Sequence, residues 1–183
     1  FATDPDALAT QSEGVLSEIA GFPRETARSF RAGVTGDLVE EEMRLMEAHE
    51  TRLMTRFDPD YPVLLKQMSV PPTVLYVAGE LEADDELAVA VVGPRSPSMY
   101  GRDMAGRIGR ELARAGLTVV SGFARGVDAE AHWGALRADG RTLGVLGCGQ
   151  AINYPAGHED LRARIVGGGG AIVSEYPMTA RPL

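Results

Sequence analysis

Residues 89–128 read VAVVGPRSPSMYGRDMAGRIGRELARAGLTVVSGFARGVD, and this stretch decides the fold. Two short apolar runs, at 87–92 and 117–120, flank a helical pattern over 100–115. Apolar runs of this kind are typical of strands buried on both faces, and a helix between two such strands joins them in parallel with a right-handed crossover. The loops after both strands therefore leave the same carboxyl edge of the sheet, where open α/β sheets bind their ligands.

The rest of this region repeats the same alternation. Further strands are predicted at 73–77, 142–146 and 171–173, and further helices at 129–138 and 158–166. Strands that alternate with helices favour an α/β fold. We therefore predict a doubly wound, mostly parallel sheet.

The helix predicted over 100–115 has one strongly apolar face. Met104, Ile108 and Leu112 recur at intervals of four residues, so we expect this face to be buried. Gly116 follows at the position where a helix cap favours a residue with positive φ.

The N-terminal part is predicted to be a separate small helical domain. We assign residues 1–56 to it and 57–183 to the α/β domain, because the turn-rich segment 56–62 (RFDPDYP) separates them. Within the first domain, residues 1–12 are expected to form a loose leader and 38–54 a charged helix.

A glycine-containing turn divides the helical pattern of residues 15–30. Gly21 ends one helix and Pro23 opens the next, so the segment resembles a degenerate helix-hairpin-helix or SAM-like unit. Pro23 has no backbone N–H, which removes one donor that such a turn would offer to phosphate. The sequence favours the alternative, a small helical domain that only packs.

The composition sets limits on the class of protein. The chain has 183 residues, 44% of them hydrophobic, without an apolar run of membrane-spanning length or a signal-peptide pattern, so we expect a globular cytoplasmic protein. The single cysteine, Cys148, excludes an internal disulfide. A formal net charge of −8 argues against a generally basic nucleic-acid binder but permits a local basic patch. Lys66 is the only lysine, so the cations are almost all arginines, which match phosphates with two parallel hydrogen bonds.

Small or polar residues follow four of the predicted strands. Because parallel strands end at one edge, these segments should form a single crevice with converging polar groups. The segments are Gly93-Pro94-Arg95-Ser96, Ser121-Gly122, Gly147-Cys148-Gly149 and Ser174-Glu175.

The first two segments carry the groups that suit an anion. Arg95 and Ser96 precede a helix, and Arg125 lies between Gly122 and Gly126, which permit close backbone approach. Tight packing is the alternative explanation for each glycine.

Three other residues near the crevice are expected to have structural roles. We expect Asp128 to cap the helix over 129–138 and to organise the loop before it. His132 is expected to be buried and hydrogen-bonded, tying this helix to the loops. Cys148 is expected to be a small filler, because the sequence arranges no base beside it.

Several enzyme classes lack their motifs here. The sequence contains no GxxxxGK[ST] nucleotide loop, no GxGxxG after the first strand, no Cys/His cluster with zinc spacing and no GxSxG nucleophile elbow. We therefore predict no catalytic residue, no metal and no cofactor.

Four motifs occur in unbroken order over residues 58–177. They read VAVVGPRSPSMYG, VVSGFARGVDAEAHWGAL, GRTLGVLGCGQAINYP and GGAIVSEYP, preceded by YPVLLKQMSVPPTVLYVAGEL. Together they resemble the DNA processing protein A (DprA/Smf) family, most specifically in the block at 121–132. The resemblance implies an extended Rossmann-like fold. It also implies a non-catalytic single-stranded DNA-binding protein that dimerises, protects incoming DNA and helps to load the RecA recombinase during natural transformation.

The family's phosphate-binding motifs are carried over residue by residue. Pro94 stands where the family has a hydroxyl residue, and Ser96 is the candidate to compensate. Phe123 and Tyr154 are open to two interpretations, base stacking and hydrophobic packing under the loops. The DNA-binding residues implied by the resemblance are Gly93, Arg95, Ser96, Ser121, Gly122, Phe123, Arg125, Gly126, Gly149 and Tyr154.

The resemblance also leaves alternatives. Family members continue past SEYP into an arginine-rich stretch and more sheet, so we expect this chain to lack the C-terminal part of the domain. The rival function is cleavage of nucleoside monophosphates by a related phosphoribohydrolase-type enzyme. That class carries a PGGxGTxxE motif, and Gly167–Gly170 here lacks its Thr and Glu. A scaffold with a vestigial crevice is the third reading.

Overall fold

The computed structural model describes residues 11–18, 23–33 and 36–182. The chain divides into two compact units, Phe1–Arg44 and Leu45–Leu183. Among the described helices, none combines the length and the apolar character needed to cross a membrane.

The first unit is helical where it is described. Leu16 and Ala27 are its buried apolar residues, and the Ser12 hydroxyl accepts a hydrogen bond from the Val15 N–H at the start of the first helix. The expected leader falls mostly outside the described residues, as does the turn at Gly21. The helices are α2 (Glu13–Ser17), α3 (Arg24–Gly33) and α4 (Gly36–Ala48), the last of which continues into the second unit.

The second unit is built on a six-stranded sheet with the order β1-β2-β6-β5-β4-β3. Strands β3 to β6 pair in parallel, whereas β2 is antiparallel to both β1 and β6. The predicted α/β fold with a mostly parallel sheet is confirmed, but the sheet is not doubly wound in the described chain, because the helices between its parallel strands lie on one face. The strands are β1 (Thr51–Thr55), β2 (Val74–Gly79), β3 (Ala88–Ala90), β4 (Thr118–Ser121), β5 (Thr142–Leu146) and β6 (Ala171–Ser174).

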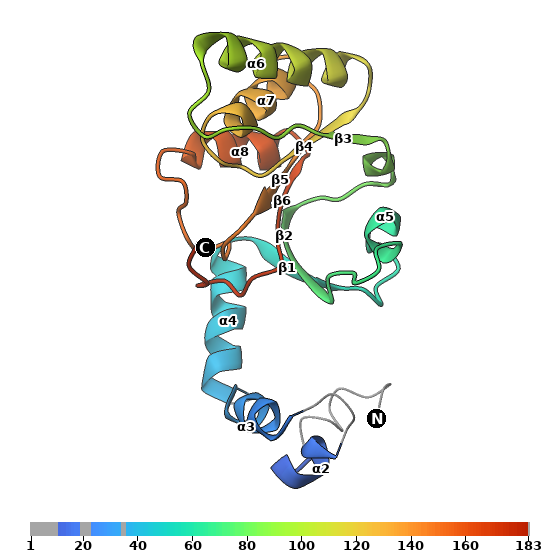
Figure 1. Cartoon of the computed structure of the whole chain (residues 1–183), viewed down its shortest axis with the longest axis vertical. Coiled ribbons are helices and arrows are strands. Elements are labelled where there is room, and N and C mark those ends of the chain that lie inside the picture. The colour runs from blue at the N-terminus through green and yellow to red at the C-terminus, as the bar shows by residue number, and fades with distance from the viewer. Residues whose placement is uncertain (1–10, 19–22, 34–35, 183) are drawn as a thin grey trace. The chain divides into compact units, whose positions relative to one another are not determined.

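Helices cover the two faces of the sheet unequally. The parallel strands follow one another across the sheet, so right-handed crossovers place their three connecting helices along one face. The opposite face is covered, in the described chain, by the short α5 and the segments around it (Figure 1). The helical elements are α5 (Val63–Lys66), the 3₁₀ turn η1 (Ala83–Glu86), α6 (Met99–Arg114), α7 (Val127–Leu136) and α8 (Glu159–Gly167).

Apolar clusters on both faces of the sheet form the core. On the α7/α8 side, Phe123, Leu161 and Ile172 belong to one buried cluster. On the α5 side, Met54 and Val77 belong to another, against which the α5 residue Leu65 packs. Burial on both faces explains the continuous apolar runs in the sequence.

The helix predicted over 38–54 is wrong in its last part. α4 ends at Ala48, and residues 51–55 form β1, whose Thr51 pairs with Ala78 and whose Thr55 pairs with Val74. A short run such as TRLMT is ambiguous by periodicity, and pairing with β2 decides its conformation. Because β1 belongs to the sheet, the second unit begins at Leu45, before the expected residue 57.

The predicted buried face of α6 is only partly right. Ala105 and Gly109 are the buried residues of this helix and Leu112 packs against the core, while Ile108 is 43% exposed. The reason is close approach of α7, because a Cβ on Gly109 would collide with the main chain of Ala131. Small residues therefore form the closest contact between α6 and α7.

Candidate nucleic-acid interface

Three loops leave the carboxyl edge of the parallel strands. We call residues 92–97 the first loop, 122–126 the second loop and 147–158 the third loop; they follow β3, β4 and β5. This arrangement agrees with the crevice expected from the sequence.

The first and second loops touch at main-chain level. Gly126 has φ of +85°, and a Cβ there would lie 2.5 Å from the carbonyl oxygen of Pro94 and 2.7 Å from that of Arg95. The Val127 N–H donates to the Pro94 carbonyl at 3.3 Å, and Gly93 lies against the Val127 side chain. Glycine is therefore required at 126 both for its conformation and for space.

Two arginines from different loops converge on the third loop. Nη1 of Arg95 lies 3.4 Å from the hydroxyl of Tyr154, and Nη2 of Arg125 lies 3.5 Å from the carbonyl oxygen of Ala156. Both side chains are exposed, and neither forms an ion pair with any described acidic residue. Two guanidinium groups without an acidic partner among the described residues therefore lie next to the third loop.

A small cavity of about 180 Å³ lies beside Arg95. No Asp or Glu is among the described residues that line it, so an anion would meet no opposing carboxylate. Gly122 contributes to the wall and lies against the side chain of Asp128. The lining residues are Arg95, Gly122, Phe123, Ala124, Leu146, Gly147, Cys148, Tyr154, Pro155 and Pro182.

The structure buries three of the residues predicted to contact DNA, and two of them are Ser121 and Gly149. The Ser121 hydroxyl is buried and donates to the Val91 carbonyl at 2.6 Å, so it ties β4 to the strand beside it. Gly149 is buried, its N–H donates to Ala180 at 2.8 Å, and a Cβ would collide with the main chain of Met178. Ser121 and Gly149 therefore have structural roles. Ser96, in contrast, is exposed on the first loop.

The two aromatic candidates differ in accessibility. Phe123 is only 4% exposed and its ring meets that of His158 edge-on at 5.3 Å, so it packs beneath the second loop rather than offering a face to a base. Its φ of +59° is unusual for a bulky residue. Tyr154 is 39% exposed, and its ring is the accessible one.

Asp128 and His132 occupy structural positions that differ from the expected ones. Gly126 takes the cap position of α7, so Asp128 lies in the first turn, where its carboxylate accepts from the Ala124 N–H at 3.2 Å. His132 is fully buried, and its Nδ1 lies 2.7 Å from the hydroxyl of Thr142. The histidine therefore ties α7 to β5 rather than to the loops.

The hydrogen bonds of His132 define its neutral form. The Thr142 hydroxyl donates to the Val119 carbonyl at 2.8 Å, so it accepts from His132, whose proton lies on Nδ1. Nε2 is then a buried acceptor without a partner among the described residues. Burial, followed by the charge of His158, lowers the pKa of His132 to about 4.

The amino edge of the sheet is closed by an ion-pair network. Arg141 binds both carboxylate oxygens of Asp85, at 2.6 and 2.7 Å, and donates to the carbonyl oxygens of Glu80 and Gly169. Burial alone would raise the pKa of Asp85, but hydrogen bonds from Arg141 and its other donors hold it below the ordinary value. The glycine run after α8 lies at this edge, away from the crevice.

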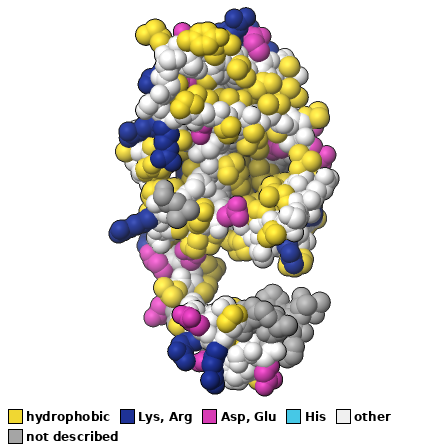
Figure 2. Space-filling view, in the orientation of Figure 1, with side chains coloured by type: hydrophobic (Ala, Val, Ile, Leu, Met, Phe, Trp, Pro, Cys, Tyr) yellow, Lys and Arg dark blue, Asp and Glu magenta, His cyan; other side chains and the backbone are white. Residues whose placement is uncertain are grey.

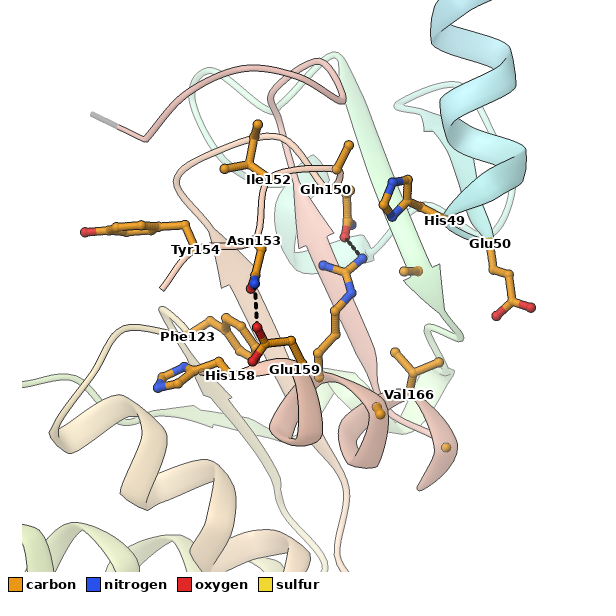
Figure 3. Close-up of a pocket in the computed structure, with 15 residues that line it drawn as sticks. His49, Glu50, Phe123, Gln150, Ile152, Asn153, Tyr154, His158, Glu159 and Val166 are labelled. Atoms are coloured by element: carbon orange, nitrogen blue, oxygen red, sulfur yellow. Dashed lines mark hydrogen bonds between the residues drawn. The ribbon is translucent and has the colours of Figure 1, made fainter. Parts of the chain in front are cut away.

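Sequence reasoning missed a second group of residues near the crevice. A larger cavity of about 600 Å³ is lined by residues of α8, the third loop and the end of α4, among them Gln150, His158 and Arg162 (Figure 3). Gln150 directly follows a glycine-rich strand end, which was an available signal. Arg162 gave no such signal, because a charged residue next to a buried Leu161 is expected to be solvent-exposed.

The fold and the carboxyl edge define the class of this protein: a Rossmann-like α/β protein with an exposed pair of arginines at the ligand edge of its sheet. The chain belongs to the DNA recombination-mediator protein A family, whose model matches residues 52–183. The resemblance read from the sequence motifs is confirmed.

Known proteins agree with this family membership. The chain is 36% identical over 174 residues to Protein Smf of Synechocystis, covering 91% of this chain and 43% of that protein. It is similar to the structure of DNA processing protein A from Streptococcus pneumoniae, with a TM-score of 0.77, 27% identity and coverage of 94% of this chain and 59% of the other.

A second solved structure concerns the single-stranded DNA binding mode of DNA processing protein A from Helicobacter pylori. The TM-score is 0.61 and the identity 29%, with coverage of 74% of this chain and 60% of that one. The chain thus spans less than half of the curated Synechocystis relative and about 60% of either solved structure.

Proposed function

We propose that this protein binds single-stranded DNA at the carboxyl edge of its sheet and acts as a recombination mediator without catalysing a reaction. The observation that carries the proposal is the convergence of Arg95 and Arg125 on the third loop, beside a cavity without carboxylates. The DNA-binding mode studied for the Helicobacter pylori relative supports the choice of ligand.

The mechanism combines phosphate contacts with stacking. Arg95 and Arg125 bind successive phosphates through charge-assisted hydrogen bonds, and Ser96 adds a hydroxyl. The accessible ring of Tyr154 stacks on a base, a contact that every base allows. Gly93 and Gly122 are exposed and let the backbone approach the strand, whereas Gly126 holds the two loops together. Phosphate contacts and stacking together give affinity for single-stranded DNA without base-specific recognition.

The direct test is fluorescence anisotropy with labelled oligo-dT and with a duplex of equal length across a salt series. Two phosphate contacts predict that log affinity for the single strand falls with log salt with a slope of about −1.4. Single-strand binding tighter than duplex binding, with at least this slope, supports the proposal. Affinity that is absent or independent of salt would overturn it.

We propose further that the protein acts in the cytoplasm, protecting incoming DNA and helping to load the RecA recombinase during natural transformation, and that it forms a homodimer. Exposed apolar side chains near the edge strand β3, including Leu87, Val92 and Met99, offer a surface for a partner. Figure 2 shows hydrophobic side chains gathered over the middle of the larger unit.

Light scattering at increasing protein concentration tests the homodimer, and Val92→Asp with Met99→Asp should then favour the monomer. A mass that stays monomeric at every concentration would refute the homodimer.

Stimulation of RecA filament growth on oligo-dT coated with single-strand-binding protein tests the loading role, and an unchanged rate would refute that role.

A further inference from the structure

A second cavity lies next to the crevice and is lined mostly by other groups. Its volume is about 600 Å³, within the range of small-molecule sites. Ala78, Ile152 and Val166 give it an apolar wall, and Gln150 and Arg162 supply polar groups. Tyr154 borders both this cavity and the smaller one beside Arg95.

Arg162 is a half-buried cation without an acidic partner among the described residues. Its Nη2 donates to Oε1 of Gln150 at 2.5 Å, and a neutral amide oxygen compensates a buried charge poorly. Burial accordingly lowers the pKa of Arg162. Its other N–H groups remain available to an incoming acceptor.

Gln150 holds this guanidinium in place. Its amide nitrogen donates to the carbonyl oxygens of Tyr76, at 2.9 Å, and Ile172, at 2.7 Å. Both amide protons are thus used on the sheet, and the amide oxygen is fixed toward Arg162. A cation positioned in this way beside an apolar wall has the features of a preorganised anion site.

Neither carboxylate of the lining forms an ion pair with Arg162. Glu159 accepts from the Asn153 amide at 2.5 Å, and these two side chains point toward each other in Figure 3. Glu50 points away from the other labelled side chains (Figure 3). His49 and His158 also line the cavity.

We propose that this cavity binds a small organic oxyanion, a phosphate or carboxylate on a compact apolar or ring-shaped body, with Arg162 holding the anion and Gln150 positioning Arg162. The anion comes either from a free small molecule or from a phosphate of the bound strand. The site uses none of the phosphate contacts assigned to Arg95 and Arg125.

The test uses phenyl phosphate, with benzoate and inorganic phosphate as companion probes. Calorimetry at constant ionic strength measures affinity, and the arginine Nε–H resonances report which guanidinium is contacted. Phenyl phosphate should bind and shift the Arg162 resonance. If neither phenyl phosphate nor benzoate binds, the proposal is overturned.

Two variants on α8 separate the site from general charge. Arg162→Gln should weaken phenyl phosphate binding by about tenfold or more, because it removes a charge-assisted contact. Arg164→Gln is the matched control: Arg164 is exposed and paired with Asp160, so the affinity should change less than about twofold. An equal loss in both variants would overturn the proposal.

Stability distinguishes a binding role from a structural one. Without a ligand, Arg162→Met removes an uncompensated, half-buried charge but also leaves the buried Gln150 amide oxygen without its donor, so the two effects should offset each other and the melting temperature should change little. A clear decrease would mean that Arg162 is a structural residue and would overturn the proposal. The resonance titration of the unaltered protein remains decisive should a variant fail to fold.

Oligo-dT separates the two sources of the anion. A shift of the Arg162 resonance by oligo-dT, competed by phenyl phosphate, assigns the site to a strand phosphate; a shift by phenyl phosphate alone assigns it to a free molecule. Arg95→Gln should lose DNA affinity but retain phenyl phosphate binding, so failure of either proposal is visible without the other.

Discussion

The guanidinium of Arg95 lies 3.4 Å from the hydroxyl of Tyr154, and this contact joins the first loop to the third across the carboxyl edge of the sheet. The charge that would bind a phosphate and the ring that would stack on a base are thus adjacent. Substitutions at the two positions should separate these contributions.

Loss of either exposed arginine should weaken binding to single-stranded DNA. Arg95→Gln and Arg125→Gln each remove one phosphate contact, which predicts about tenfold lower affinity and a salt slope shallower by about 0.7. Anisotropy with oligo-dT measures both quantities. Arg114→Gln is the control, because Arg114 lies on α6 and pairs with Glu111; an equal effect there would argue against a local site.

Tyr154 should contribute through its ring rather than its hydroxyl. Tyr154→Phe removes the contact with Arg95 but keeps the aromatic face, so oligo-dT affinity should change little. Tyr154→Leu should cost about 1–3 kcal/mol of binding free energy if a base stacks on the ring. Equal affinities of the two variants would show that the ring makes no stacking contact.

The ion pair at the amino edge should stabilise the fold. Asp85→Asn leaves the mostly buried Arg141 with only the exposed carboxylate of Glu82, 3.3 Å away, and should lower the free energy of unfolding at pH 7 by about 2–4 kcal/mol. Urea denaturation measures the change. Asp160→Asn breaks the exposed pair with Arg164 and should cost less than about 1 kcal/mol. Similar costs for the two would contradict the role given to burial.

His132 should make the protein less stable in mild acid. Its pKa is about 4 in the folded state, below the ordinary value of 6.5, so the unfolded chain takes up the proton first as the pH falls. The stability it contributes is complete above pH 6.5 and is lost between pH 6.5 and 4, by up to about 3 kcal/mol.

Urea titrations at several pH values test this dependence. His132→Asn keeps a donor near Thr142 but cannot be protonated, so its stability should vary less between pH 4 and 6.5 even if it is lower at pH 7. An unchanged slope in this variant would assign the acid sensitivity to other groups.

Much of the fold followed from the sequence because the strand and helix signals were local. The strand at 142–146 and the helices after β3, β4 and β5 lie within a few residues of their predicted bounds. β1 was missed because pairing with β2, a long-range contact, determines it. The buried face of α6 was predicted only in part, because its neighbour approaches through glycine, which periodicity does not reveal.

The site was predictable in position but less so in detail. Topology places Arg95 and Arg125 at one edge, and the structure brings both to the third loop. The sequence could not show that Ser121 and Phe123 are buried, because burial depends on how neighbouring loops pack over a strand end. The sequence also could not reveal that Arg162 lines a cavity, because the residues around it come from separate segments of the chain.

The contact of Gly126 with the carbonyl oxygens of Pro94 and Arg95 has a mechanical consequence. The first and second loops share a boundary of main-chain atoms that lies next to Arg95 and one residue from Arg125. A substitution that disturbs the backbone of one loop should therefore disturb the other loop as well. We expect the energetic effects of such changes in the two loops not to add.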